Sequence, residues 1–289
     1  MIDEQTVWDD IWPVVERLIA ATAAADASSD APAIHQLLLP GGQAADALAL
    51  FGPVVFDILL KTVLGRERLG LTRAIEGDGG REAFIEYAWP DPTTRGSYTA
   101  VDVVAVRLAQ TDDGWRVVEI NPASADLPLN SLRATSILAG TQVMNDDGKL
   151  PEEPWILPVA LYAGLLQLPL AAGAAVGPVE GRLLPGLQER GYGLLPLIYG
   201  RRLWRDFVAA TAPEEADRPE GWAAAVEGLL SEQSNRGESQ AAVGRHYRAA
   251  LALVSARSNQ IRRSLSITPF DERYTDLKTT EIVYKETDE

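Results

Sequence analysis

The stretch 98–121, YTAVDVVAVRLAQTDDGWRVVEIN, constrains the fold of this chain more than any other. Its first half carries apolar residues at every second position, which is the period of a β-strand. These residues are Val101, Val103 and Ala105. The sequence Asp-Asp-Gly at 112–114 favours a tight turn, because glycine accepts a positive φ without steric cost. Residues 115–120 have the composition of a second strand, so the stretch predicts a β-hairpin.

The residues before this hairpin predict helices followed by two more strands. Apolar side chains recur at helical spacing over 6–25 and 43–64, with a short helix between them. The period changes to two over 69–76 and 82–89, on either side of a glycine-rich turn. We therefore expect an α+β domain at residues 1–150, in which N-terminal helices pack on a four-stranded antiparallel sheet.

The second half of the chain is rich in alanine and leucine and predicts an all-helical domain over 151–265. Its last two helices are expected at 219–233 and 238–264, and residues 266–289 are expected to form an extended or disordered tail. The apolar stretch 155–176 is long enough to raise a membrane span, but proline and glycine interrupt it and no basic cluster flanks it. Two short buried helices are the preferred interpretation.

Composition limits the classes of partner. The formal net charge of −15 over 289 residues argues against a nucleic-acid backbone or an anionic membrane, because both repel an acidic surface. The chain has no cysteine and only two histidines, His35 and His246, which leaves few ways to build a zinc site or a catalytic His–carboxylate pair. The N-terminal residues show no basic and apolar signal segment, so a cytoplasmic location is expected.

Polar and apolar side chains alternate along the predicted central strands, which gives the sheet two faces. The apolar face, expected to pack on the helices, carries Ile85, Tyr87, Val101, Val103, Ala105, Val118 and Ile120. The polar face carries Glu86, Tyr98, Asp102, Trp115, Glu119 and Asn121. Three carboxylates and two aromatic rings on one face are typical of a ligand-binding or acid/base site, and equally of a solvent face or dimer interface.

Three helices before a meander that ends in VRLAQTDDGWRVVEI resemble the NTF2-like (SnoaL-like) superfamily, over roughly residues 5–125. The resemblance implies a cone-shaped sheet around a pocket. It also implies either a small-molecule lyase or isomerase, or a non-catalytic binding domain that pairs through its sheet. Enzymes of that superfamily use an Asp/His pair inside the cone, which makes Asp102 and His35 the candidate catalytic residues. Asp102, however, belongs to the polar face, which points away from the predicted interior.

A second resemblance is local. The sequence Glu119-Ile120-Asn121-Pro122, with Asp102 on the neighbouring strand, is similar to the metal site of the ATP-grasp ligases. It implies that Asp102, Glu119 and Asn121 hold Mg²⁺ against the phosphates of ATP. That family also needs lysines and a glycine-rich loop upstream, whereas only Lys61 precedes this hairpin.

The expected function is a non-catalytic binding or assembly protein without a cofactor, which uses the polar sheet face or the cone pocket. A protein partner, a second copy of the chain or a small molecule would occupy that site. The alternatives are an NTF2-like lyase or isomerase and a divergent ATP-grasp ligase with Mg²⁺ and ATP. Arg201, Arg202 and Arg205 form the densest basic group, and they are expected to pair with nearby acids or to contact a carboxylate of the first domain or an anionic ligand.

Overall fold

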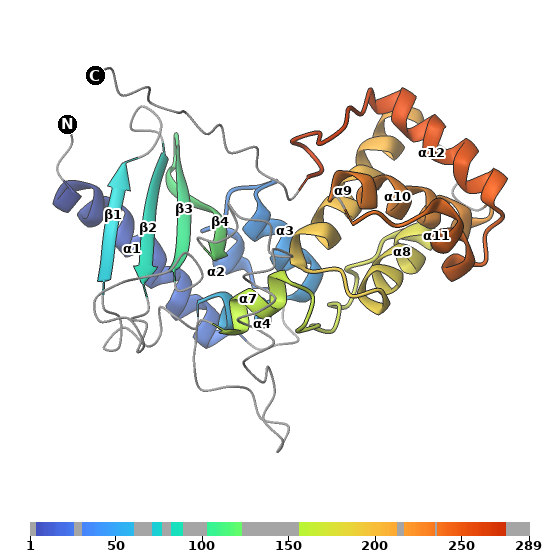
Figure 1. The fold of residues 1–289 in the computed structure, drawn as a ribbon. Helices are drawn as coiled ribbons and strands as arrows, with labels where there is room; N and C mark the ends of the chain where they lie inside the picture. The colour runs from blue at the N-terminus through green and yellow to red at the C-terminus, as the bar shows by residue number, and fades with distance from the viewer. Residues whose placement is uncertain are drawn as a thin grey trace, which may run out of the picture.

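The structure, a computed structural model, describes residues 4–25, 31–60, 71–76, 82–88, 103–122, 156–212, 217–234 and 236–275. In these residues the N-terminal helices are α1 (Glu4–Ala24), α2 (Pro32–His35), α3 (Gln43–Phe51) and α4 (Val54–Leu59). The strands are β1 (Leu71–Glu76), β2 (Glu82–Ala88), β3 (Val103–Thr111) and β4 (Gly114–Pro122). The later helices are α7 (Ile156–Tyr162), α8 (Gly177–Glu189), α9 (Leu194–Thr211), α10 (Pro219–Gln233), α11 (Gln240–Tyr247) and α12 (Leu251–Leu265) (Figure 1).

Helix α1 has an apolar face that packs on the sheet. Ile11, Val14, Val15 and Leu18 recur every three or four residues and are all buried. The helix continues through Pro13 and contacts β1, β2 and β4. Figure 1 shows it crossing behind the strands. Burial of these side chains between helix and sheet forms the first part of the hydrophobic core.

The four strands form an antiparallel meander in the order β1-β2-β3-β4. Val106 of β3 lies opposite Ile85 of β2 and Ile120 of β4, and all three side chains are fully buried. The register then shifts between Arg107 and Leu108, so that Leu108 pairs with Val117. This β-bulge places one extra residue in β4 and brings Val117 onto the same buried face as Ile120.

The predicted fold class, helices on an NTF2-like cone, is wrong, although the mixed α+β class is partly consistent with the structure. Most of the regular structure in the described part of the chain is helical. The strands are only six to nine residues long and form an open meander. The apolar side of the sheet packs against α1 and α3, and the buried side chains of both helices belong to the same hydrophobic core as those of the strands.

The predicted apolar face does not include two residues of β3, Val106 and Leu108, whose side chains are fully buried. The side chains of the predicted Val101, Val103 and Ala105 lie outside the described residues. The bulge explains why strict alternation fails in β4, because both Val117 and Val118 are buried.

Segments from distant parts of the sequence cover the outer edge of β4. The segment after α2 forms a parallel bridge between Leu38 and Val117. Val117 donates to the carbonyl of Leu37 (2.9 Å) and accepts from the amide of Leu39 (2.8 Å). Helices α3 and α7 also contact β4, and α3 contacts α9. An edge with these partners has few backbone groups left for pairing with another strand.

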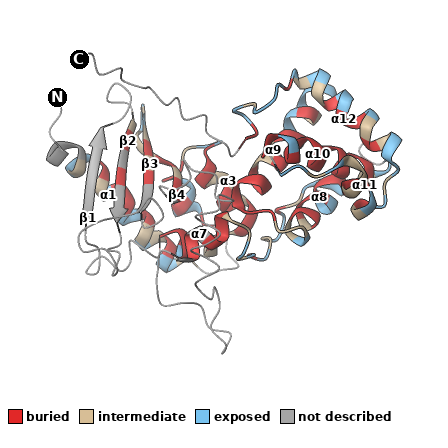
Figure 2. Ribbon diagram, viewed as in Figure 1, coloured by how far each residue is buried: buried red, intermediate tan, exposed pale blue. Residues whose placement is uncertain are grey.

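The helical part of the chain packs around α10, which is buried along nearly its whole length (Figure 2). Trp204 and Phe207 of α9 meet Trp222 of α10, with ring centroids 5.7 and 5.2 Å from the Trp222 ring. Helices α8, α9, α11 and α12 all contact α10. No helix in the described ranges is long and apolar enough to cross a bilayer.

Candidate functional site

The predicted polar sheet face is described only in part. Tyr98 and Asp102 lie outside the described residues, as does the side chain of Glu86. The geometry of a site that depends on Asp102 therefore stays a prediction. Trp115, Glu119 and Asn121 lie on β4 within the described residues.

Glu119 is half-buried and forms an ion pair with Arg107 of β3. The Arg107 guanidinium donates to Glu119 Oε1 (3.3 Å) and to Glu82 Oε1 of β2 (2.8 Å). Burial lowers the pKa of Arg107, but Glu119 and Glu82 outweigh this effect and the net shift is upward. Arg107 therefore stays positively charged beside Glu82 and Glu119. Its charge weakens the attraction of Glu119 for a metal ion.

Asn121 is buried and contacts α7 instead of projecting into solvent. The hydroxyl of Tyr162, at the end of α7, lies 2.5 Å from Asn121 Oδ1 and also contacts the carbonyl of Ile120. The side chain of Gln43 on α3 donates to the same hydroxyl and accepts from the amide of Ile120 (3.2 Å). Burial raises the pKa of Tyr162 well above its ordinary value, so the hydroxyl stays protonated. This network joins β4 to two helices.

We expect Tyr162→Phe to reduce the free energy of unfolding by about 1–3 kcal/mol, because it leaves buried groups of Gln43 and Asn121 without a hydrogen-bond partner. Urea denaturation followed by tryptophan fluorescence measures the change. Tyr192→Phe is the matched control, since its buried hydroxyl makes no hydrogen bond within the described residues. Equal effects of the two substitutions would contradict a special role for the Tyr162 network.

The two other described candidates lie apart from this network. His35 is exposed at the end of α2. Trp115 is half-buried and lines a cavity of about 500 Å³, together with Arg17 of α1, Leu37 and Arg116. No group of three or more His, Asp or Glu side chains that could hold a metal ion is found in the part of the chain that the structure describes.

The arginine group on α9 pairs with acids. Arg205 donates to both oxygens of Glu180, a buried carboxylate of α8 (2.7 and 3.2 Å), and Arg201 lies 3.8 Å from the same carboxylate. Arg202 contacts Asp46 of α3 and donates to the carbonyl of Gly41 (2.6 Å). The expected pairing with nearby acids is thus confirmed, and one of these acids belongs to the N-terminal part of the chain.

The C-terminal helices have a geometry that the sequence patterns do not predict. Residues 238–264 were expected to form a single helix, and this prediction is wrong. Helix α11 ends at Tyr247, Arg248 takes a left-handed conformation (φ 57°, ψ 35°), and α12 begins at Leu251. Helix α10 packs against both of them. The order of these helices, and the three-residue turn between the second and the third, match those of a helix-turn-helix.

The turn between α11 and α12 depends on Gly244. The amide of Ala249 donates to the carbonyl of Gly244 (2.8 Å), which closes the turn. A Cβ on residue 244 would lie 2.9 Å from the carbonyl oxygen of Ala249, closer than real Cβ atoms come to a backbone oxygen. Val243 and Val254 are fully buried on either side of the turn. The sequence therefore specifies the close approach of the two helices.

One side of α12 is fixed to α10. Ser258 donates to the carbonyl of Ala225 (3.3 Å), and Ile261 is fully buried. The buried Arg257 donates to the carbonyls of Arg218 (2.6 Å) and Asp217 (2.8 Å), and its guanidinium lies 4.3 Å from the centre of the Trp222 ring. Since these contacts occupy Arg257 inside the fold, its role is structural.

The opposite side of α12 is exposed (Figure 2). Its exposed residues are Leu251, Ala252, Ala256, Asn259, Gln260, Arg263 and Ser264. Figure 1 shows α12 at the outer edge of the helical part, on the side away from the sheet. Helix α12 is therefore attached to the fold along one side and exposed along the other.

Charge is unevenly distributed along the chain. Residues 239–270 contain five arginines and no aspartate or glutamate, within a chain of net charge −15. Arg245, Arg248 and Arg263 are exposed. Among the acids near this stretch, Glu232 pairs with Arg262, Glu238 with Arg190 and Asp271 with Arg273, while Glu189 and Glu220 lie beside His246 and Arg248. The exposed cations that α11, α12 and the turn between them contribute are therefore Arg245, Arg248 and Arg263.

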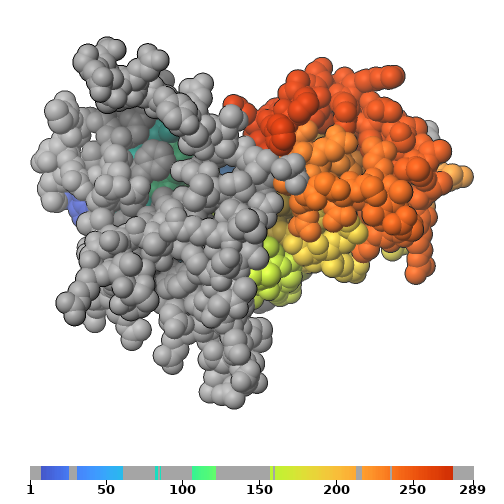
Figure 3. Space-filling model, in the orientation of Figure 1, coloured from blue at the N-terminus to red at the C-terminus, as the bar shows by residue number. Residues whose placement is uncertain are grey.

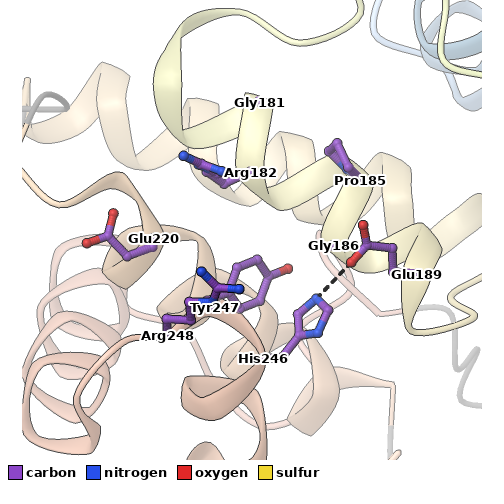
Figure 4. Close-up of a pocket in the computed structure, with 9 residues that line it drawn as sticks. All are labelled: Gly181, Arg182, Pro185, Gly186, Glu189, Glu220, His246, Tyr247 and Arg248. Carbon is purple, nitrogen blue, oxygen red and sulfur yellow. Dashed lines mark ion pairs between the residues drawn. The ribbon is translucent and has the colours of Figure 1, made fainter.

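A cavity of about 530 Å³ lies between α8 and the α11–α12 turn (Figure 4). Arg182 and Glu189 of α8 and His246 and Arg248 line it. Figure 4 shows His246 and Glu189 facing each other, with His246 Nε2 3.6 Å from Glu189 Oε2. The cavity has charges of both signs and so favours neither an anionic nor a cationic ligand.

The sequence contained one signal for the helix-turn-helix that helical periodicity misses. The absence of acids over 239–270 marks a local surface that the whole-chain charge conceals. Comparison of the chain with family models, with curated proteins and with solved structures gives no match. Function is therefore inferred from the geometry.

Proposed function

We propose that this chain is a non-catalytic protein that binds duplex DNA, with α12 inserted into the major groove. The observation that carries the proposal is the helix-turn-helix of α10, α11 and α12, whose last helix is fixed by one side and exposed on the other. In this arrangement the third helix lies in the groove and the helix before it crosses the phosphate backbone. This proposal keeps the non-catalytic binding function expected from the sequence. The proposed binding surface, however, is α12 instead of the polar face of the sheet.

Local charge supports the proposal where whole-chain charge opposes it. Phosphate contacts supply most of the sequence-independent affinity for DNA, and they come from cations on the contacting face. Arg245 on α11 and Arg263 on α12 are both exposed. Figure 3 shows the orange and red atoms of the C-terminal helices at the outer surface of the molecule. Acidic side chains elsewhere would repel the duplex from other faces and so favour this orientation.

The test uses the purified chain and a fluorescein-labelled duplex with a randomised core. We expect anisotropy to report binding with a Kd on the order of 10 µM, weakening steeply with added salt. The double variant Arg245→Ala/Arg263→Ala should weaken binding about tenfold and make the slope of log K against log salt concentration less negative by about 2, because two phosphate contacts are lost. Circular dichroism checks that the variant remains folded.

The matched control is Arg17→Ala/Arg116→Ala, which also removes two positive charges, but from a site beside the sheet. This variant should bind like the unaltered chain. Binding that is absent, or that falls equally in both double variants, would contradict the proposal.

A further inference from the structure

We infer that α12 reads an A·T-rich major groove, through contacts with thymine methyl groups and adenine edges. This inference rests on the proposed function and adds the class of sequence that is bound. It comes from the side chains that α12 exposes, in the order in which they follow one another along the helix.

The first two turns of the exposed face are apolar. Leu251 is 52% exposed, Ala252 follows it directly, and Ala256 is exposed about one turn beyond Ala252. In a helix-turn-helix the N-terminal residues of the recognition helix meet the base edges. Small apolar side chains are suited there to the C5-methyl group of thymine, which is the only apolar group that unmodified bases present in the major groove.

The third turn carries two amides. Asn259 and Gln260 are exposed, and neither side chain has a hydrogen-bond partner among the residues that the structure describes. Asn and Gln pair with the N6 and N7 atoms of adenine through two hydrogen bonds. Since Ala252, Ala256 and Asn259 follow one another at intervals of four and three residues, they lie on one helix face. The contacts of the two alanines with thymine methyl groups and the contacts of Asn259 with adenine would therefore lie along one major groove.

Of the three arginines of α12, only Arg263 is placed to contact a DNA phosphate. Arg263 lies on the fourth turn, beyond the amides, and Arg262 is paired with Glu232. An arginine on the first exposed turns would have indicated guanine, whose O6 and N7 atoms it contacts. The exposed positions of these turns carry no arginine, so the face has no group that selects G·C pairs.

The test compares four labelled duplexes of equal length. These are an alternating A·T duplex, the same duplex with deoxyuridine for thymidine, an alternating G·C duplex, and that duplex with 5-methylcytosine. Deoxyuridine lacks only the methyl group, and each methyl contact that is lost should weaken binding about fourfold. We expect the thymidine duplex to bind most tightly, the deoxyuridine duplex about tenfold or more weakly, and the methylated G·C duplex more tightly than the plain one.

Surface variants locate the contacts. Leu251→Ala should reduce the ratio of thymidine to deoxyuridine affinity, whereas Leu165→Ala, at an equally exposed leucine after α7, should leave it unchanged. Asn259→Ala should weaken binding to both A·T duplexes about tenfold, because both retain adenine.

The outcomes separate the inference from the function it rests on. If no duplex binds, the proposed function fails and the inference fails with it. If all four duplexes bind equally, or G·C binds more tightly, the inference is overturned while DNA binding stands. Selection from the randomised pool gives an independent readout, since A·T pairs should be enriched in the bound fraction.

Discussion

Replacing Gly193 by alanine is expected to reduce the free energy of unfolding by about 3 kcal/mol or more. Gly193 precedes α9, and a Cβ on it would lie 1.8 Å from the carbonyl oxygen of Tyr162 and 2.6 Å from its carbon. Both are backbone atoms, so no side-chain rotation relieves the overlap. Its φ of −82° is open to any residue, and the loss is therefore steric. Urea or thermal denaturation measures it.

Gly181→Ala is the matched control for this prediction. Gly181 lies within α8 and is exposed, and a Cβ there would meet nothing within 4 Å. Alanine at an exposed helical position is expected to stabilise the chain by about 1 kcal/mol. If Gly193→Ala were as stable as Gly181→Ala, the close contact between the start of α9 and the end of α7 would be disproved.

Arg190→Met is expected to destabilise the chain by about 3–5 kcal/mol, because it leaves a buried carboxylate without its ion pair. Glu227 on α10 is fully buried, and the Arg190 guanidinium, at the end of α8, donates to it at 2.5 Å. Burial raises the pKa of Glu227 above the ordinary 4.5, although Tyr247 and Arg190 oppose the shift. Without Arg190 the pKa should rise further.

The sign of the pH dependence follows from linkage. Because the pKa of Glu227 is higher in the folded state than in the unfolded state, the folded state binds its proton more tightly. The free energy of unfolding therefore falls as pH rises from the unfolded pKa to the folded pKa. The loss caused by Arg190→Met should therefore be smallest near pH 4.5, where the raised pKa already keeps Glu227 mostly protonated in the folded state, and larger at about pH 8. Denaturation at both pH values measures the difference.

Two variants test the origin of this effect. Adding Glu227→Gln to Arg190→Met should remove most of the pH dependence, because no buried carboxylate remains to titrate. Arg182→Met, at an exposed position of the same helix, should change stability by less than about 0.5 kcal/mol. A loss that is equal at the two pH values would show that Glu227 is not its source.

Local patterns predicted much of the N-terminal part of the fold. The Asp112-Asp113-Gly114 turn joins β3 to β4 as its composition indicates, with Gly114 at φ 102°. A helix was expected over 43–64, and Gly52, with φ 72°, divides its described part into α3 and α4. These features depend on residues whose conformational preference is strong within a few positions.

The features that the sequence did not predict depend on contacts or on unusual conformations. Strict alternation could not reveal the bulge opposite Arg107, which reverses the buried parity within β4. The break between α11 and α12 carries no glycine or proline at the turn itself, because Arg248 takes the left-handed conformation. Apolar residues continue at helical spacing on both sides of it, and so the pattern was interpreted as one helix.

Whole-chain charge and local charge give opposite expectations for nucleic acid. The net charge of −15 predicted that DNA is excluded, while the acid-free stretch 239–270 favours DNA as the partner. Titration of the duplex decides between them, because only one allows salt-sensitive binding that depends on Arg245 and Arg263.

The Tyr162 network has a consequence for the order in which the chain folds during synthesis. Gln43 and Asn121 precede Tyr162 by 119 and 41 residues, so a ribosome completes the sheet well before it makes the hydroxyl that bonds to both. The nascent N-terminal part therefore holds polar groups that find their final partner only when α7 has emerged. The junction of β4 and α3 with α7 should thus be completed only after the strands of the sheet have been synthesised.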